Sequence, residues 1–205
     1  MVPEDINEKH RQRMERINEI KDRQLASATE EKGLIIVHTG SGKGKSTAAF
    51  GMAMRSLGQG MKVGIVQFIK GAIATGEAAM IEKLSEQGFP IEMHTMGEGF
   101  TWKTQDRERD IATAMRGWQK ATELIRDPSF DLIILDELNI ATKYEYIPVD
   151  LVVDELLDKR EMLHVVVTGR NADEQLLEVA DLASEMKVIK HPYSKGIKPQ
   201  PGVEF

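Results

Sequence analysis

The sequence predicts an α/β fold in which helices cover both faces of a mostly parallel sheet, with an N-terminal helical arm in front of it. Short, near-continuous apolar runs indicate strands buried on both faces, and helical patterns alternate with these runs. The first segment is instead dense in charge. With 205 residues, 41% of them hydrophobic, the chain suits one large core with an appendage. We expect a helical arm over residues 1–32 and a core domain over residues 33–205.

The arm is rich in Glu, Lys, Arg and Gln, and neither Pro nor Gly interrupts residues 4–31. These residue types favour a helix. The apolar residues of the arm form a broken series that is too thin to anchor it firmly to a core. Two interpretations stay equally open: a solvated helix or frayed tail, and a helix that packs on a partner or covers a ligand.

The core domain begins at Gly33, where apolar runs start to alternate with helical patterns. Val- and Ile-rich runs predict strands, Gly58 and Gly60 are stop signals after the first core helix, and Pro148 introduces a later helix. The expected strands cover residues 34–37, 62–69, 90–95, 131–135, 163–168 and 185–190. The expected helices cover residues 46–57, 78–87, 106–126, 149–159 and 173–179. Residues 191–205 are rich in Pro, Gly and Lys and are expected to form an irregular tail.

A glycine-rich loop with the sequence TGSGKGKST, residues 39–47, joins the first strand to the first core helix. Glycines at alternate positions let backbone N–H groups turn inward and approach a phosphate closely. Lys45 supplies a positive charge, and Ser46 opens a helix whose N-terminus favours anions. The Ser46 hydroxyl is also placed to ligate Mg²⁺.

The loop departs from the usual phosphate-loop pattern, in which the first glycine lies six residues before the lysine. Here Thr39 occupies that position, and Gly40 lies five residues before Lys45. Strand, loop, Gly-Lys-Ser and helix nevertheless follow in the order that phosphate binding needs. The sequence therefore predicts nucleotide binding and a P-loop NTPase-like three-layer fold.

A second acidic element, LIILDE, ends an expected strand in Asp136 and Glu137. In P-loop proteins such a strand often ends near the metal ion. One carboxylate is expected to hold Mg²⁺ directly or through water, and the other to orient it or activate water; spacing alone does not decide which. Arg170 follows another expected strand, in VVVTGR, and either contacts phosphates or is structural.

Composition narrows the cellular setting. The chain has no cysteine, which excludes disulfides and Cys-ligated metal centres and fits a reducing cytoplasm. A formal charge of −6 gives no support for nucleic-acid binding. No apolar run approaches the roughly 20 residues of a membrane span, and the charged N-terminus has no apolar core of a signal peptide. We expect a cytoplasmic protein that contacts neither nucleic acid nor membrane.

Several motifs in unbroken order resemble the ATP:corrinoid adenosyltransferases of the BtuR/CobA type, the cob(I)yrinic acid a,c-diamide adenosyltransferases. The resemblance spans roughly residues 8–205, and the shortened phosphate loop is the family's form. It is carried by GSGKGKSTAAFG, VGIVQFIKG, GFTWKTQDRE, ILDEL, VVVTGR, SEMKVIKH and the terminal GIKPQPGVEF.

The resemblance implies that the 5′-deoxyadenosyl group of ATP moves to the cobalt of a reduced corrinoid, with inorganic triphosphate as leaving group. It implies Mg²⁺ or Mn²⁺ at Ser46 and Glu137, and functional roles for Arg107 and Arg170. The residues that it implies at the nucleotide are Gly40, Ser41, Gly42, Lys43, Gly44, Lys45, Ser46 and Thr47. It also implies a homodimer, with the arm reaching over the partner's active site, and a reduced flavoprotein as electron donor.

Phe100 and Trp102 are two aromatics in one loop, a pattern that by itself more often indicates packing. The resemblance implies instead that they displace the lower axial ligand of the corrinoid, which makes reduction of cobalt(II) to cobalt(I) easier. The five histidines are scattered and are expected at surface or satisfied polar positions.

Three other functions share parts of this pattern: a RecA-like P-loop ATPase, a carrier that binds nucleotide or corrinoid without catalysis, and a small-molecule kinase. An ATPase would release phosphate without corrinoid, a kinase would release ADP, and a carrier would give no product. Only the motifs beyond the phosphate loop separate these from the transferase.

Overall fold

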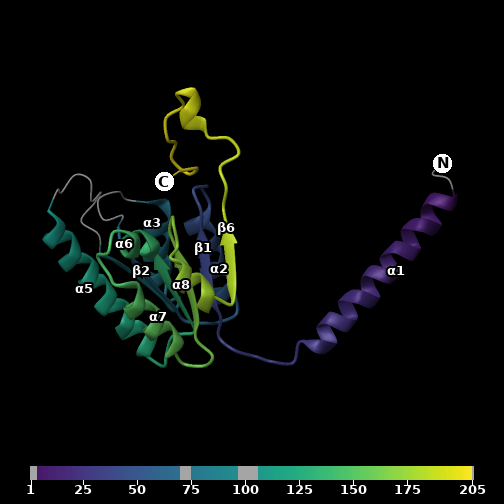
Figure 1. The fold of residues 1–205 in the computed structure, drawn as a ribbon, viewed down its shortest axis with the longest axis horizontal. Coiled ribbons are helices and arrows are strands. Elements are labelled where there is room, and N and C mark those ends of the chain that lie inside the picture. Colours follow the sequence, from purple (N-terminus) through teal and green to yellow (C-terminus); the bar gives the residue numbers. More distant parts are fainter. Residues whose placement is uncertain (1–3, 70–74, 97–105, 205) are drawn as a thin grey trace. The chain divides into compact units, whose positions relative to one another are not determined.

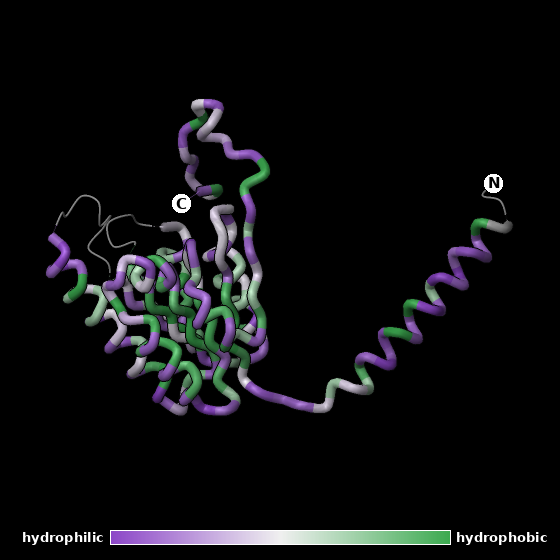
Figure 2. The backbone as a smooth tube through the Cα atoms, in the orientation of Figure 1, coloured by the Kyte–Doolittle hydropathy of each residue, from purple (hydrophilic) through white to green (hydrophobic). Residues whose placement is uncertain are grey.

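The computed structural model describes residues 4–69, 75–96 and 106–204. The chain divides into two compact units, Met1–Lys32 and Gly33–Phe205. The first unit contains helix α1, Glu4–Ser27, on which purple hydrophilic positions outnumber green hydrophobic ones (Figure 2). Ile6, Met14 and Leu25 are exposed on this helix.

The second unit alternates strands and helices, as the sequence predicts (Figure 1). Its strands are β1 Ile35–Thr39, β2 Val63–Gln67, β3 Ile91–Thr95, β4 Leu132–Asp136, β5 His164–Thr168 and β6 Leu182–Glu185. Its helices are α2 Lys45–Gly58, α3 Gly76–Glu86, α5 Arg107–Arg126, α6 Leu138–Lys143, α7 Val149–Leu157 and α8 Glu174–Val179. A short 3₁₀ helix, Pro192–Lys195, lies in the expected irregular tail.

The described strands form one six-stranded sheet in the order β3-β2-β4-β5-β1-β6, and every neighbouring pair is parallel. All carboxyl ends of the strands therefore lie along one edge. Strand β5 separates β4 from β1, so the acidic strand end lies about two strand spacings, or roughly 9.5 Å, from the start of the glycine loop.

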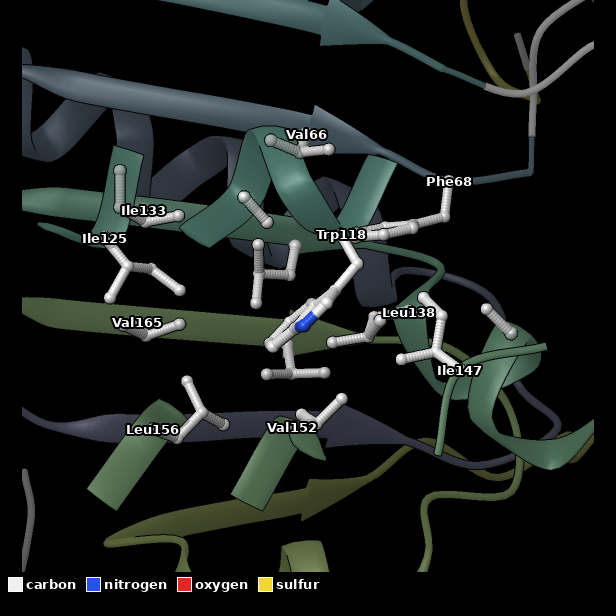
Figure 3. Close-up of a cluster of buried hydrophobic side chains, with 14 of the residues drawn as sticks. Val66, Phe68, Trp118, Ile125, Ile133, Leu138, Ile147, Val152, Leu156 and Val165 are labelled. Atoms are coloured by element: carbon white, nitrogen blue, oxygen red, sulfur yellow. The ribbon is translucent and has the colours of Figure 1, made fainter. Parts of the chain in front are cut away.

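Helices cover the two faces of the sheet, and each face has its own apolar core. The larger core lies beneath α5, α6, α7 and α8, and Trp118 of α5 packs there among strand and helix side chains (Figure 3). The smaller core lies beneath α2 and α3. Because β-strand side chains alternate between faces, neighbouring residues of each strand enter different cores. Ile133 thus belongs to the larger core and Ile134 to the smaller one.

Local signals explain where the helices begin. Asp106 precedes α5 and its side chain accepts a hydrogen bond from the backbone N–H of Arg109 at 3.1 Å. Thr75 caps α3 in the same way through Ala78. Such caps stabilise a helix by about 1 kcal/mol each. No helix in the three described ranges is both long and apolar enough to cross a membrane.

The last strand was predicted at residues 185–190, and this prediction is wrong. Strand β6 covers Leu182–Glu185, and its last residue pairs with Thr39, the final residue of β1. Beyond Thr39 the chain turns into the glycine loop, so the apolar residues after Glu185 have no strand to pair with. Helix α6, a six-residue helix directly after β4, was not predicted.

Candidate functional site

The glycine loop, residues 39–47, turns sharply between β1 and α2, and its backbone requires glycine at two positions. Gly40 and Gly44 have φ values of 96° and 104°, in the left-handed region. A Cβ atom on Gly40 would also lie 2.4 Å from the carbonyl oxygen of Met186, and one on Gly42 would lie 2.7 Å from the same oxygen. The loop is therefore built for close approach of backbone atoms.

Lys45 lies at the first position of α2 and is only 6% exposed. Its ammonium donates hydrogen bonds to the carbonyl oxygens of Gly40, at 2.9 Å, and Gly42, at 2.5 Å. These two carbonyls hold the positive charge inside the curve of the loop. A buried ammonium needs such oxygen partners, and an incoming phosphate would add a stronger one.

The C-terminal tail, residues 186–204, contacts the same loop. The Gly42 amide donates to the carbonyl oxygen of Met186 at 2.6 Å, and the Met186 amide donates to Thr39 at 2.9 Å. Lys43 forms an ion pair with Glu204 near the end of the chain. The Glu204 side chain is 11% exposed although most of the tail around it is exposed. Two of the loop's candidate phosphate-binding groups, the Gly42 amide and the Lys43 ammonium, therefore face groups of the tail.

The remaining predicted loop residues lie at the start of α2 and on the outside of the loop. Ser46 is half-buried in the first turn of α2, next to Lys45. Ser41 and Thr47 are exposed. The structure thus brings all the nucleotide-contact candidates of the sequence analysis together at one edge of the sheet.

Four polar side chains line the carboxyl ends of neighbouring strands on the α2 face, and we call them the polar row. They are 7% exposed or less and comprise Gln67 of β2, Asp136 of β4, Thr168 of β5 and His38 of β1. Gln67 is paired in register with Asp136, and His38 with Thr168. The polar row lies on the same face of the sheet as the smaller core, because its residues are two or four positions along each strand from residues of that core.

Asp136 is fully buried, and both of its carboxylate oxygens accept hydrogen bonds. Gln67 donates to one oxygen at 2.8 Å, and the Thr168 hydroxyl donates to the other at 2.7 Å. The Thr168 hydroxyl in turn accepts the backbone N–H of Glu137 at 3.0 Å. Asp136 is therefore committed to holding β2, β4 and β5 together.

Glu137 is the first residue after β4 and has a left-handed φ of 64°, which is uncommon for a residue with a side chain. It is half-buried. Both carboxylate oxygens of Asp136 already accept hydrogen bonds from Gln67 and Thr168. Glu137 is therefore the better candidate for a metal ligand, as the family resemblance implies. The sequence alone left this choice between the two acids open.

His38 corrects one prediction of the sequence analysis, which placed the histidines at surface or satisfied polar positions. It is 7% exposed, and neither ring nitrogen has a hydrogen-bond partner in the described part of the chain. Burial lowers the pKa of the His38 imidazole, because the charged form would lose its hydration. Burial therefore favours the neutral form of this side chain.

The remaining predicted site residues are two exposed arginines and two aromatic residues. Arg170 is exposed and follows Gly169, two residues after β5 ends. Arg107 opens α5 and lies 3.7 Å from Glu145, with both side chains largely exposed. Phe100 and Trp102 lie outside the described residues.

The side chains at the carboxyl edge of the sheet can be compared with the ligands that a divalent metal ion needs. The described residues contain no group of three or more His, Asp or Glu side chains that could hold a metal ion alone. Mg²⁺ does not need such a group, because it is usually bound by one or two protein oxygens together with substrate phosphates. The hydroxyl of Ser46 and the carboxylate of Glu137 supply oxygen ligands of this kind, so the donor set suits Mg²⁺.

Three features were not predicted from the sequence: the polar row, the ion pair of Glu204 with Lys43, and Asn139 of α6. The row residues are single polar positions in apolar strands, and only the pairing of the strands brings them together. One feature of the sequence sets them apart. Each is the last or second-last residue of its strand, at an alternating position whose side chain faces α2. Nothing in the sequence indicates that Glu204 reaches Lys43.

A parallel sheet, a glycine loop between the first strand and a helix with a buried lysine, and an acidic strand end define the class of P-loop proteins. A family model described as ATP:corrinoid adenosyltransferase BtuR/CobO/CobP matches residues 31–205. The corrinoid adenosyltransferase of Pseudomonas aeruginosa is 51% identical over 199 residues, which cover 97% of each chain.

Two further relatives, both named corrinoid adenosyltransferase, match over a similar length. The protein of Sinorhizobium sp is 54% identical and covers 96% of this chain and 92% of its own. That of Escherichia coli K12 is 42% identical and covers 97% of this chain and 99% of its own. The chain belongs to the ATP:corrinoid adenosyltransferase family.

Proposed function

We propose that this chain transfers the 5′-deoxyadenosyl group of ATP to the cobalt(I) of a corrinoid, in adenosylcobalamin biosynthesis or salvage. The electron pair of cobalt(I) forms a bond to the 5′ carbon, and the bond from that carbon to oxygen breaks. The electron pair of the broken bond leaves with inorganic triphosphate. The observation that carries this proposal is the family match, which spans the whole second unit and not the phosphate loop alone.

The glycine loop suits this chemistry because the whole triphosphate gains charge as it departs from carbon. Lys45, which the loop holds in place through Gly40 and Gly42, would stabilise that charge together with backbone N–H groups of the loop. Lys43 would contribute a second positive charge once it exchanges Glu204 for phosphate oxygens. We assign nucleotide contacts to the remaining residues of 40–47 on the same grounds.

Ser46 and Glu137 would hold Mg²⁺ or Mn²⁺, which when bound neutralises part of the triphosphate charge. A carboxylate that activates water would waste ATP, so we assign metal binding and not general-base catalysis to Glu137. The engagement of Asp136 by Gln67 and Thr168 supports this assignment. Arg107 and Arg170 are proposed to contact the triphosphate or the corrinoid.

Phe100 and Trp102 are proposed to face the lower side of the corrinoid and exclude its axial ligand. Apolar aromatic rings suit this task because they fill space without ligating cobalt. Trp102→Ala is expected to bind ATP normally and to lose most transfer from a cobalt(II) substrate under a mild reductant. Turnover equal to that of the parent protein would remove the ligand-exclusion role.

A homodimer and a reduced flavoprotein as electron donor complete the proposal.

The direct test is anaerobic. Purified protein is mixed with Mg-ATP and chemically reduced cobalamin, and the visible spectrum is followed in the dark and then on illumination. The expected result is a light-sensitive adenosylcobalamin spectrum that forms only when protein and ATP are both present. Bound ATP with no such spectrum would overturn the proposed activity on cobalamin, and cobinamide and the a,c-diamide precursor are tested in parallel.

A further inference from the structure

Asn139 lies in the first turn of α6, two residues after Glu137, and none of its surface is exposed. Its side-chain amide donates a hydrogen bond to the carbonyl oxygen of Gly169 at 3.0 Å, across 30 residues of sequence. Its other polar atom, Oδ1, is buried with no hydrogen-bond partner in the described part of the chain. An unsatisfied buried acceptor costs free energy, so packing alone does not explain an asparagine here.

Gly169 is held against Asn139 from several sides. Its φ of 132° lies in a region that residues with a side chain rarely adopt, and a Cβ atom on it would lie 2.8 Å from the Cβ of Asn139. Its N–H donates to the carbonyl oxygen of His38 at 3.2 Å. Both backbone polar groups of Gly169 are therefore fixed, one by the end of β1 and one by Asn139. The next residue along the chain is Arg170.

The same region contains two further links between the acidic segment, residues 136–139, and the end of β5. The backbone N–H of Glu137 donates to the Thr168 hydroxyl, and that hydroxyl donates to Asp136. The Asn139 bond extends this set by two residues along the acidic segment, from Glu137 to Asn139, and by one residue beyond β5, from Thr168 to Gly169. Without the Asn139 bond, the described hydrogen bonds between these segments would end at Thr168, one residue short of Gly169.

We propose that Asn139 is a positioning residue that fixes the Gly169–Arg170 turn against the acidic segment. Arg170 and Glu137 are thereby presented to the same triphosphate, one as a positive charge and the other as a metal ligand. The inference rests on the proposed function, in which a triphosphate is the group that both residues serve. Asn139 itself touches no substrate; it acts through Arg170.

The test uses inorganic triphosphate as the probe, since binding of this product is measured without turnover. Calorimetry with Mg²⁺ gives its dissociation constant for the parent protein, Asn139→Leu, Arg170→Ala and the double variant. Leucine is close to asparagine in size and lacks the donor. Each single change is expected to weaken triphosphate binding roughly 10-fold, because a charge-assisted contact is lost or misplaced. The double variant is expected to bind no more weakly than Arg170→Ala, because Asn139 acts through that arginine.

Thr142→Val is the matched control. Thr142 is a buried residue of the same helix, and its hydroxyl donates to the backbone carbonyl oxygen of Asn139 at 3.1 Å and not to Gly169. This variant perturbs α6 without removing the bond to the turn, and it is expected to bind triphosphate like the parent protein. If Asn139→Leu does not fold, Asn139→Ala, which removes the donor without adding a charge, takes its place in this comparison of single and double variants.

Additive losses in the double variant would overturn the proposal, because Asn139 would then act independently of Arg170. Normal triphosphate binding by Asn139→Leu, or a loss in Thr142→Val as large as in Asn139→Leu, would overturn it as well. Failure of the proposed function gives a different result. In that case the parent protein would form no adenosylcorrinoid, while the coupling between Asn139 and Arg170 would still be measurable through triphosphate.

Discussion

The glycine loop and the acidic segment both lie at the carboxyl edge of the sheet, but they are held in place by different means. The centre of the loop is stabilised locally, because Lys45 bonds to carbonyls that lie five and three residues before it, and the tail adds contacts through Met186 and Glu204. The acidic segment is stabilised by residues from distant parts of the chain. Gln67 lies 69 residues from Asp136, and Thr168 lies 32 residues from it.

This difference indicates how each region should respond to change. The bonds of Lys45 are local and the other described partners of the loop include the exposed tail, so substitutions in the loop are expected to affect ligand binding more than folding. The acidic segment depends on three strands being in register, so substitutions in it are expected to affect folding first. Substitutions in and around the two regions are expected to separate these effects.

Asp136→Ala is expected to lower the free energy of unfolding by about 4 kcal/mol. It leaves two buried donors, on Gln67 and Thr168, without an acceptor, and each such donor costs about 1–3 kcal/mol. Asp136→Asn is the matched control, because its carbonyl accepts from Thr168 while the Gln67 amide reverses to accept from its NH₂. Denaturant unfolding measures both variants. Equal stability of the alanine and asparagine variants would contradict the role given to this network.

Lys45→Ala is expected to weaken ATP binding roughly 100-fold, or about 3 kcal/mol, and to lower the free energy of unfolding less than Asp136→Ala does. The ammonium is the buried positive charge of the loop, and no other group of the loop takes its place. Lys83→Ala, at an exposed position of α3, removes the same charge elsewhere and serves as control. ATP affinity is measured by calorimetry. Normal affinity in Lys45→Ala would show that the loop is not the phosphate site.

His38 gives a smaller effect that depends on pH. Its pKa is lowered by burial from an ordinary value of 6.5. Below about pH 6.5 the unfolded chain therefore takes up a proton that the folded chain does not, so stability falls as the pH drops. His38→Leu is expected to flatten this fall between pH 6.5 and the lowered pKa, and His10→Gln on exposed α1 is not. Unfolding curves at several pH values measure it; equal slopes with and without His38 would contradict its neutral, buried state.

Glu204→Gln is expected to give the smallest change, an ATP affinity about two- to threefold higher. The carboxylate pairs with Lys43 and competes with phosphate for its charge. The Lys43 side chain is about half exposed, and ion pairs near the surface contribute about 0.5 kcal/mol. Glu178→Gln, at an exposed position of α8, changes the net charge equally and is expected to leave affinity unchanged. Weaker ATP binding by Glu204→Gln would mean that the tail supports the nucleotide site and does not compete with it.

The same difference explains what the sequence could predict. The glycine loop is contiguous, so TGSGKGKST was enough to place Gly40, Lys45 and Ser46 at one site. The alternation of strands and helices was equally readable, because each buried strand is a continuous apolar run. The error at β6 arose because apolar content after Glu185 resembles a strand, whereas pairing ends where β1 ends at Thr39.

The contacts of the acidic segment could not be predicted, because they depend on strand order. A sequence shows that Asp136 and Glu137 end a strand, but not that β5 lies between β4 and β1 or that Thr168 occupies one oxygen of Asp136. The contact of Asn139 with Gly169 depends on the same arrangement. His38 could not be predicted either, since its burial follows from the helices that cover the strand and not from its neighbours in sequence.

The central claim is that the chain directs attack to the 5′ carbon of ATP and not to a phosphorus atom. Phosphorus NMR of the products, taken after anaerobic turnover with reduced corrinoid, tests it most directly. We predict one inorganic triphosphate for each adenosylcorrinoid formed, with no ADP. ADP or free phosphate in place of triphosphate would show attack at phosphorus and would contradict the claim.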